Sequence, residues 1–173
     1  MKTPVAGVVL LVALSAAGCG GNELDWKEVT SQDGGFKVLM PPGADKFSAE
    51  EEPPVGKITL TTYTVKQKGD GYFMAWADLP PKPPFDPEEF LKGIQKRYDN
   101  AEKKNSKAIT LQDNPGLEFE LETAKGRKVV GRLYVVKNRL YELIVIGDGA
   151  KSPASDAAQK FFASFQLLDP LMK

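Results

Sequence analysis

The stretch GLEFELETAKGRKVVGRLYVVKNRLYELIVIG, residues 116–147, decides the fold. Short turn-prone segments divide it into three runs rich in β-branched and aromatic residues, at 117–123, 128–136 and 140–146. The first run alternates apolar and acidic residues: Leu117, Glu118, Phe119, Glu120, Leu121 and Glu122. Because side chains of a strand alternate between faces, the carboxylates lie opposite the apolar residues. The stretch predicts an antiparallel meander with an acidic face toward solvent.

The register of the first hairpin follows from its turn. A three-residue loop at 124–126 with Gly126 in the left-handed conformation uses a glycine where that conformation requires one. This loop places Leu121 opposite Val129 and Glu118 opposite Arg132. A two-residue loop shifts the register by one and sets glutamates among apolar residues. We therefore predict the three-residue loop.

Two alternatives exist for the second hairpin. A two-residue loop, Lys137 and Asn138, brings Glu142 to the leucine face. A three-residue loop through Arg139 keeps Glu142 beside Tyr134 but asks a non-glycine residue to adopt a strained backbone. We favour the two-residue loop and expect Glu142, near a sheet end, to reach water.

Residues 1–18 have the pattern of a targeting segment, with Lys2 followed by an apolar run too short to span a bilayer. The run ends Ala16-Ala17-Gly18-Cys19, which resembles the lipoprotein signal of bacteria, with alanine where that signal usually has leucine. The resemblance implies cleavage before Cys19 and acylation of that residue, the only cysteine. The alternative is an ordinary secretory signal cut after Ala17.

Cleavage leaves a tether at 19–25 and one domain at 26–170. Once Lys2 is removed, the mature chain has 22 basic residues, which nearly balance its 23 acidic ones. Nucleic acid is an unsuitable partner because no basic stripe exists. We expect a protein held in the bacterial cell envelope by lipid on Cys19, facing the periplasm or the cell surface. Its other partner is a protein or another envelope component.

The remaining elements are two helices, at 86–104 and 153–165, and further strands. Asp86, Pro87 and Glu89 form the N-terminal signals of the first helix, including a capping box. Gly93 interrupts it, and we interpret this glycine as permitting close approach to the sheet. The strands are predicted at 26–30, 36–40, 57–66, 72–79, 107–111 and 166–168, with a long loop at 41–56. Together they predict an α+β fold, a twisted and mostly antiparallel sheet of six to eight strands packed with two helices, resembling an α/β/α sandwich.

The order of three segments resembles PsbP-like (PsbP/Mog-type) proteins. The segments are Gly35-Phe36-Lys37-Val38-Leu39-Met40-Pro41, Gly131-Arg132-Leu133-Tyr134 followed by Arg139-Leu140-Tyr141-Glu142-Leu143, and Phe161-Phe162-Ala163-Ser164-Phe165. The resemblance implies a non-catalytic protein, since members are typically extrinsic photosystem subunits, binding proteins or uncharacterised bacterial lipoproteins. It carries over no functional residue and no cofactor.

The residue types restrict catalysis. The chain has no histidine, and with its one cysteine acylated the Ser-His-Asp and Cys-His mechanisms and thiolate or histidine metal sites are excluded. We therefore expect no enzyme, no cofactor and no metal, and a lipid-anchored binding or accessory domain. The first alternative is a small-ligand carrier with a pocket between the sheet and loop 41–56, and the second, ranked below it, is an envelope hydrolase that uses carboxylates. Candidate ligand-binding residues are Glu118, Arg132, Tyr134 and Trp76.

Overall fold

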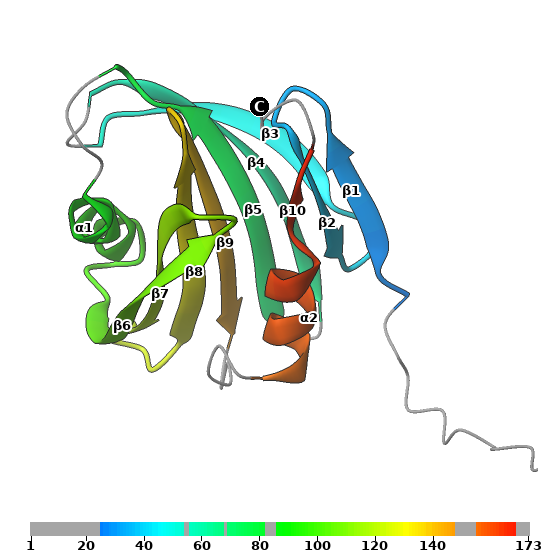
Figure 1. Ribbon diagram of the computed structural model, residues 1–173. Coiled ribbons are helices and arrows are strands. Elements are labelled where there is room, and N and C mark those ends of the chain that lie inside the picture. The colour runs from blue at the N-terminus through cyan, green and yellow to red at the C-terminus, as the bar shows by residue number, and fades with distance from the viewer. Residues whose placement is uncertain (1–24, 54–55, 68, 82–85, 148–154, 169–173) are drawn as a thin grey trace, which may run out of the picture.

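The computed structural model describes residues 25–53, 56–67, 69–81, 86–147 and 155–168 (Figure 1). The predicted signal segment, Cys19 and most of the tether lie outside these ranges. The described strands are β1 (Lys27–Ser31), β2 (Phe36–Met40), β3 (Asp45–Glu51), β4 (Ile58–Gln67), β5 (Asp70–Asp78), β6 (Glu102–Leu111), β7 (Asn114–Glu122), β8 (Lys128–Val136), β9 (Arg139–Gly147) and β10 (Gln166–Leu167). The helices are α1 (Pro87–Arg97) and α2 (Asp156–Ser164).

The strands form two antiparallel sheets. The large sheet has the order β3-β4-β5-β9-β8-β7-β6 and the small one β1-β2-β10. Figure 1 shows α1 beside one face of the large sheet, and α2 with the small sheet beside the other. The α+β prediction is confirmed, with ten strands in the described ranges instead of six to eight, and with the second helix sharing its layer with the small sheet.

Each face of the large sheet has its own core. On the α1 face, Phe90, Leu91 and Ile94 of the helix pack with the apolar side chains of β7, which include Leu117, Phe119 and Leu121. On the other face, the aromatic stripe of α2, Phe161 and Phe162 with Phe165 after it, packs with Phe36 and Tyr141. Both cores come from the period-two and helical patterns of the sequence.

Both hairpin registers are confirmed. Leu121 pairs with Val129 and Glu118 with Arg132, and Gly126 has φ +76° in the predicted three-residue loop. Val136 pairs with Arg139, so Lys137 and Asn138 form the predicted two-residue loop.

The expectation that the glutamates of the meander face water is wrong at two positions. Glu142 is only 3% exposed at its side chain, and the guanidinium of Arg97 on α1 supplies its partner instead of water. Glu118 is also buried, and it binds Lys107 and Arg132, whose guanidinium lies against Phe162 of α2. Buried carboxylates need such cationic partners to offset lost hydration.

The predicted loop at 41–56 contains a strand, β3, which is an edge strand paired with β4 from Asp45–Thr64 to Glu51–Ile58. Its residues are exposed except for the half-buried Glu51. An edge strand with little buried surface has no need of apolar alternation, and its charged sequence therefore predicts a loop where the structure has a strand.

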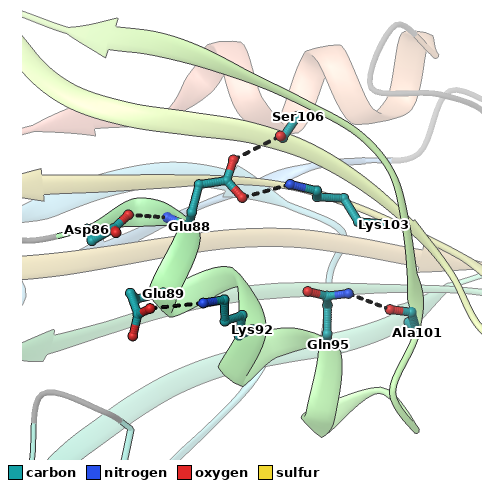
Figure 2. Close-up of polar contacts among 8 residues, drawn as sticks. All are labelled: Asp86, Glu88, Glu89, Lys92, Gln95, Ala101, Lys103 and Ser106. Atoms are coloured by element: carbon teal, nitrogen blue, oxygen red, sulfur yellow. Dashed lines mark hydrogen bonds and ion pairs between the residues drawn. The ribbon is translucent and has the colours of Figure 1, made fainter.

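The first helix is shorter than predicted. It ends at Arg97, and Asp99 and Asn100 take left-handed backbone conformations, which these two residue types tolerate. The Gln95 side chain and main chain both bond Ala101, fixing the reversal into β6, which therefore begins at Glu102 instead of 107 (Figure 2).

The N-terminus of α1 is capped, but not by a complete capping box. Asp86 accepts a hydrogen bond from the Glu88 N–H at 2.9 Å, and Pro87 follows it at the first helical position. Glu89 bonds Lys92, and Glu88 reaches Lys103 and Ser106 of β6 (Figure 2). The hydrogen bond from Lys103 is the largest of the influences that lower the pKa of Glu88.

Candidate functional site

Two adjoining cavities open beside α1, where the helix leaves part of the sheet face uncovered. The helix chamber, about 640 Å³, lies between α1 and the β3–β4 end of the sheet. The strand chamber, about 260 Å³, lies over β3, β4, β5 and β9. Both chambers are lined by Glu51, Arg97 and Glu142, so these three residues stand at their junction.

The strand chamber is hollow because of a row of side chains across four strands. Pairing of neighbouring strands aligns Phe47 of β3 with Thr62, Thr62 with Ala75, and Ala75 with Glu142 of β9. Thr62 and Ala75 are small and lie between two larger side chains, which leaves space above the sheet. Phe73 and Tyr98 also line this space, together with Ala49, Leu60 and Ile144.

Arg97 joins the two sides of the junction. Its Nη1 donates to Glu142 at 2.7 Å and its Nη2 to Glu51 at 2.7 Å, so one guanidinium connects α1 with β9 and β3. Burial lowers the pKa of this guanidinium, and the carboxylates of Glu142 and Glu51 more than offset that effect, so the pKa lies above its ordinary value. The side chain of Arg97 is nevertheless 33% exposed, against 3% for Glu142.

Gly93 lies in the wall of the helix chamber. A Cβ atom added at this position meets no atom within 4 Å, so the glycine faces open space. The predicted close approach to the sheet is therefore wrong. A mid-helix glycine costs up to about 1 kcal/mol of helix stability relative to alanine. Here the missing side chain leaves the helix chamber wider.

Aromatic side chains surround the strand chamber. Phe47 lines this chamber, is 50% exposed, and is the one large apolar side chain of the described ranges that is exposed and not buried or half-buried. Tyr98 is largely covered, and burial raises the pKa of its phenol to about 12. The chamber thus combines aromatic walls with the polar junction.

Three of the predicted ligand-binding residues lie together on the opposite face of the sheet. Arg132 Nε donates to Glu118 at 2.8 Å, and Lys107 lies 2.8 Å from the same carboxylate. Burial raises the pKa of Glu118, and the hydrogen bonds from Lys107 and Arg132 outweigh it, so the pKa is below its ordinary value. The Arg132 guanidinium also lies 5.0 Å from the Phe162 ring centre, and Tyr134 stacks on Phe165.

Trp76 is not brought to these three residues. It pairs with Tyr141, which pairs in turn with Tyr134, so one strand separates Trp76 from Tyr134. The guanidinium of Arg139 lies 4.7 Å from the Trp76 ring centre and binds Asp78. None of Glu118, Arg132, Tyr134 and Trp76 lines either chamber.

The chambers use residues that sequence analysis placed elsewhere. Phe47 and Glu51 lie in the segment 41–56, which the sequence predicts as a loop, and Arg97 lies in the predicted helix at 86–104 without being a candidate site residue. The segment 41–56 does border the chambers, as the carrier hypothesis supposed, but as strand β3 with the residues after it. Gly93 inside an amphipathic helix was the one visible signal of an open space.

Within the described ranges, no group of three or more His, Cys, Asp or Glu residues is arranged to hold a metal ion. In the same ranges, neither helix has the length and apolar character needed to cross a bilayer.

The arrangement defines an α+β protein with a curved antiparallel sheet covered on both faces. The solution structure of cyanobacterial PsbP (CyanoP) from Synechocystis sp. PCC 6803 is similar to it, with a TM-score of 0.59 and 13% sequence identity. The similarity covers 88% of this chain and 98% of that one. The chain therefore has a PsbP-like fold, as predicted. No known family model and no curated protein matches the sequence.

Proposed function

We propose that this protein is a non-catalytic, lipid-anchored binding domain that holds a small, largely apolar ligand in the two chambers beside α1. The observation that carries the proposal is the open wall at Gly93, where a helix gives up stability and no neighbouring atom uses the space. The PsbP-like fold supports a binding or accessory role, although fold alone does not define a function.

The dimensions and lining support a small ligand. Ligand sites are commonly concave, apolar cavities of roughly 300–1,000 Å³ with a few convergent polar groups. The helix chamber has a volume within this range and apolar walls from Ile58, Phe90 and Ile94. Three of its polar lining residues converge at the junction, where Arg97 meets Glu51 and Glu142.

A hydrolase fits the same residues less well. Glu51 and Glu142 are two carboxylates in one cleft, which is the arrangement that glycoside hydrolysis requires. That reaction also requires one carboxyl group to donate a proton to the leaving group. Here both carboxylates accept hydrogen bonds from the same guanidinium, which leaves neither positioned as a proton donor.

Acylation at Cys19 would hold this domain at the envelope. The sequence of residues 1–19 supports this part of the proposal, and a tether of few residues before β1 would keep the domain close to the membrane. Two or more acyl chains give stable anchoring, whereas one chain gives marginal binding.

The binding function is tested with N-phenyl-1-naphthylamine, an uncharged apolar fluorophore, titrated into the purified domain. We expect saturable binding by the wild type and at least tenfold weaker binding by Gly93→Leu, because the leucine side chain extends into the helix chamber and narrows it. Ala163→Leu is the matched control, since it adds a leucine to an exposed position of α2. Equal loss in both variants, or no saturable binding by the wild type, would reject the proposal.

A further inference from the structure

We infer that the ligand of the chambers is an organic cation, an alkylated ammonium group attached to an apolar body, with the ammonium in the strand chamber. This inference rests on the proposed binding function and adds the chemical class of the ligand. Three features of the described residues point to it: the aromatic walls, the excess of carboxylates at the junction and the apolar helix chamber beside them.

The aromatic walls favour a cation. Phe47 from β3, Phe73 from β5 and Tyr98 after α1 reach the strand chamber from three separate elements. The face of an aromatic ring attracts cations, and cages of such rings recognise quaternary ammonium groups. Folding leaves the Phe47 ring half exposed at the chamber, whereas a phenylalanine of the core is buried. A role in ligand binding explains why an apolar ring of this size stays exposed.

The charges at the junction also favour a positively charged ligand. Two carboxylates, Glu51 and Glu142, share one guanidinium, so the junction carries a net charge of −1. A ligand carboxylate would become the third anion there, whereas an ammonium group would balance the charge. Arg127 acts electrostatically on the Tyr98 phenol but does not line the chamber. The helix chamber adds one carboxylate, Glu52, and two lysines, Lys92 and Lys96, and none of the three lines the strand chamber. Lys92 is bound to Glu89.

The alkylated form of the head group follows from the polar atoms available. A primary ammonium has three donors and loses strong hydration when it is buried, so it needs several acceptors. The polar groups of the strand chamber are the two junction carboxylates, Thr62, the Tyr98 phenol and the Arg97 guanidinium, and both carboxylates already accept from Arg97. Its other walls are apolar. An N-methylated head is compatible with such walls, and the apolar body then lies along Ile58 and Ile94 in the helix chamber.

The test uses isothermal titration calorimetry with three probes of one chain length: octyltrimethylammonium, octanoate and 1-octanol. We expect octyltrimethylammonium to bind at least tenfold more tightly than either of the others. Equal or tighter binding of octanoate would mean that Arg97 selects an anion and would overturn the inference. Equal binding of 1-octanol would also overturn it, while leaving the proposed function intact. No binding of any probe would reject the proposed function itself.

Two variants locate the head group. Phe47→Ala and Glu51→Gln should each weaken octyltrimethylammonium binding at least fivefold and leave 1-octanol binding unchanged. Phe47 is exposed and Glu51 lies on an edge strand, so both variants should fold. Glu50→Gln is the control, because it removes the same charge from the neighbouring residue, whose carboxylate binds Lys57. An equal effect of Glu50→Gln, or no effect of the two chamber variants, would overturn the inference.

Discussion

The guanidinium of Arg97 and the carboxylate of Glu142 form an ion pair at 2.7 Å in which only one partner has access to water. Glu142 is enclosed by the sheet and α1, whereas a third of the Arg97 side chain is exposed and its other terminal nitrogen binds Glu51. When the pair is broken, Arg97 can therefore be solvated by water and still bind Glu51, whereas Glu142 stays buried without a partner.

This inequality predicts an order of stabilities. Arg97→Met leaves a buried carboxylate without a cation, and we expect a loss of about 3–5 kcal/mol in the free energy of unfolding. Glu142→Leu leaves an arginine that can turn toward water and keep Glu51, and it places leucine beside Leu140 and Ile144, so we expect a loss of about 1–2 kcal/mol. Urea unfolding at pH 7 measures both values. Lys92→Ala, in an exposed pair, is the control and should leave the stability nearly unchanged. Equal losses at Arg97 and Glu142 would contradict the unequal burial.

Glycine substitutions distinguish the open helix wall from a packed strand. Gly93→Ala should stabilise the protein by up to about 1 kcal/mol, because the new methyl group meets nothing within 4 Å and alanine favours helix. Gly131→Ala should destabilise it by about 1–3 kcal/mol, because its Cβ would lie 2.4 Å from the Phe119 ring and 2.9 Å from the Leu143 carbonyl oxygen. Thermal unfolding of both variants checks the signs. A destabilised Gly93→Ala would show that the helix chamber is narrower than described.

The meander could be predicted in detail because its information is local. Gly126 fixes the loop of the first hairpin, and the alternation of leucine and glutamate fixes which face each residue takes. A one-residue error in either hairpin would have reversed every side chain. The second register follows from the length of its loop and not from periodicity, because it sets Glu142 on the leucine face.

The candidate site could not be predicted because its information is not local. Arg97 and Glu142 are far apart in the chain, and only the placement of α1 against β9 brings them together. β3 has no buried stripe, so periodicity could not identify it as a strand. The faces of Glu118 and Glu142 were known from the register, but their burial depends on helices that approach from elsewhere. The pairing of strands can be inferred from the sequence pattern, whereas the burial of a sheet face by other elements is known only from the tertiary structure.

The Tyr98 phenol should make stability depend on alkaline pH. Burial raises its pKa to about 12, against 10 for a free tyrosine, so between these values the unfolded chain releases a proton that the folded chain retains. The folded state then binds more protons, and its stability falls as the pH rises. Tyr98→Phe should remove this contribution, so that the wild type loses roughly 2 kcal/mol more than the variant between pH 9 and pH 12. Urea unfolding at the two pH values measures the difference. Parallel curves for wild type and variant would show that Tyr98 is open to solvent.

Cys19 decides how the domain is attached to the envelope. If residues 1–19 are a lipoprotein signal, the wild type expressed in a bacterial host should partition into the detergent phase of Triton X-114. Mass spectrometry should then detect acyl groups on it. Cys19→Ser should remain unprocessed and unacylated, because the thioether requires sulfur. The alternative, cleavage after Ala17, gives a chain that begins at Gly18, enters the aqueous phase and retains a thiol that reacts with maleimide. Since Cys19 is the only cysteine of the chain, maleimide labelling reports on this residue alone. A labelled, aqueous wild type would therefore disprove lipid anchoring without affecting the proposed ligand site, which lies wholly within the folded domain.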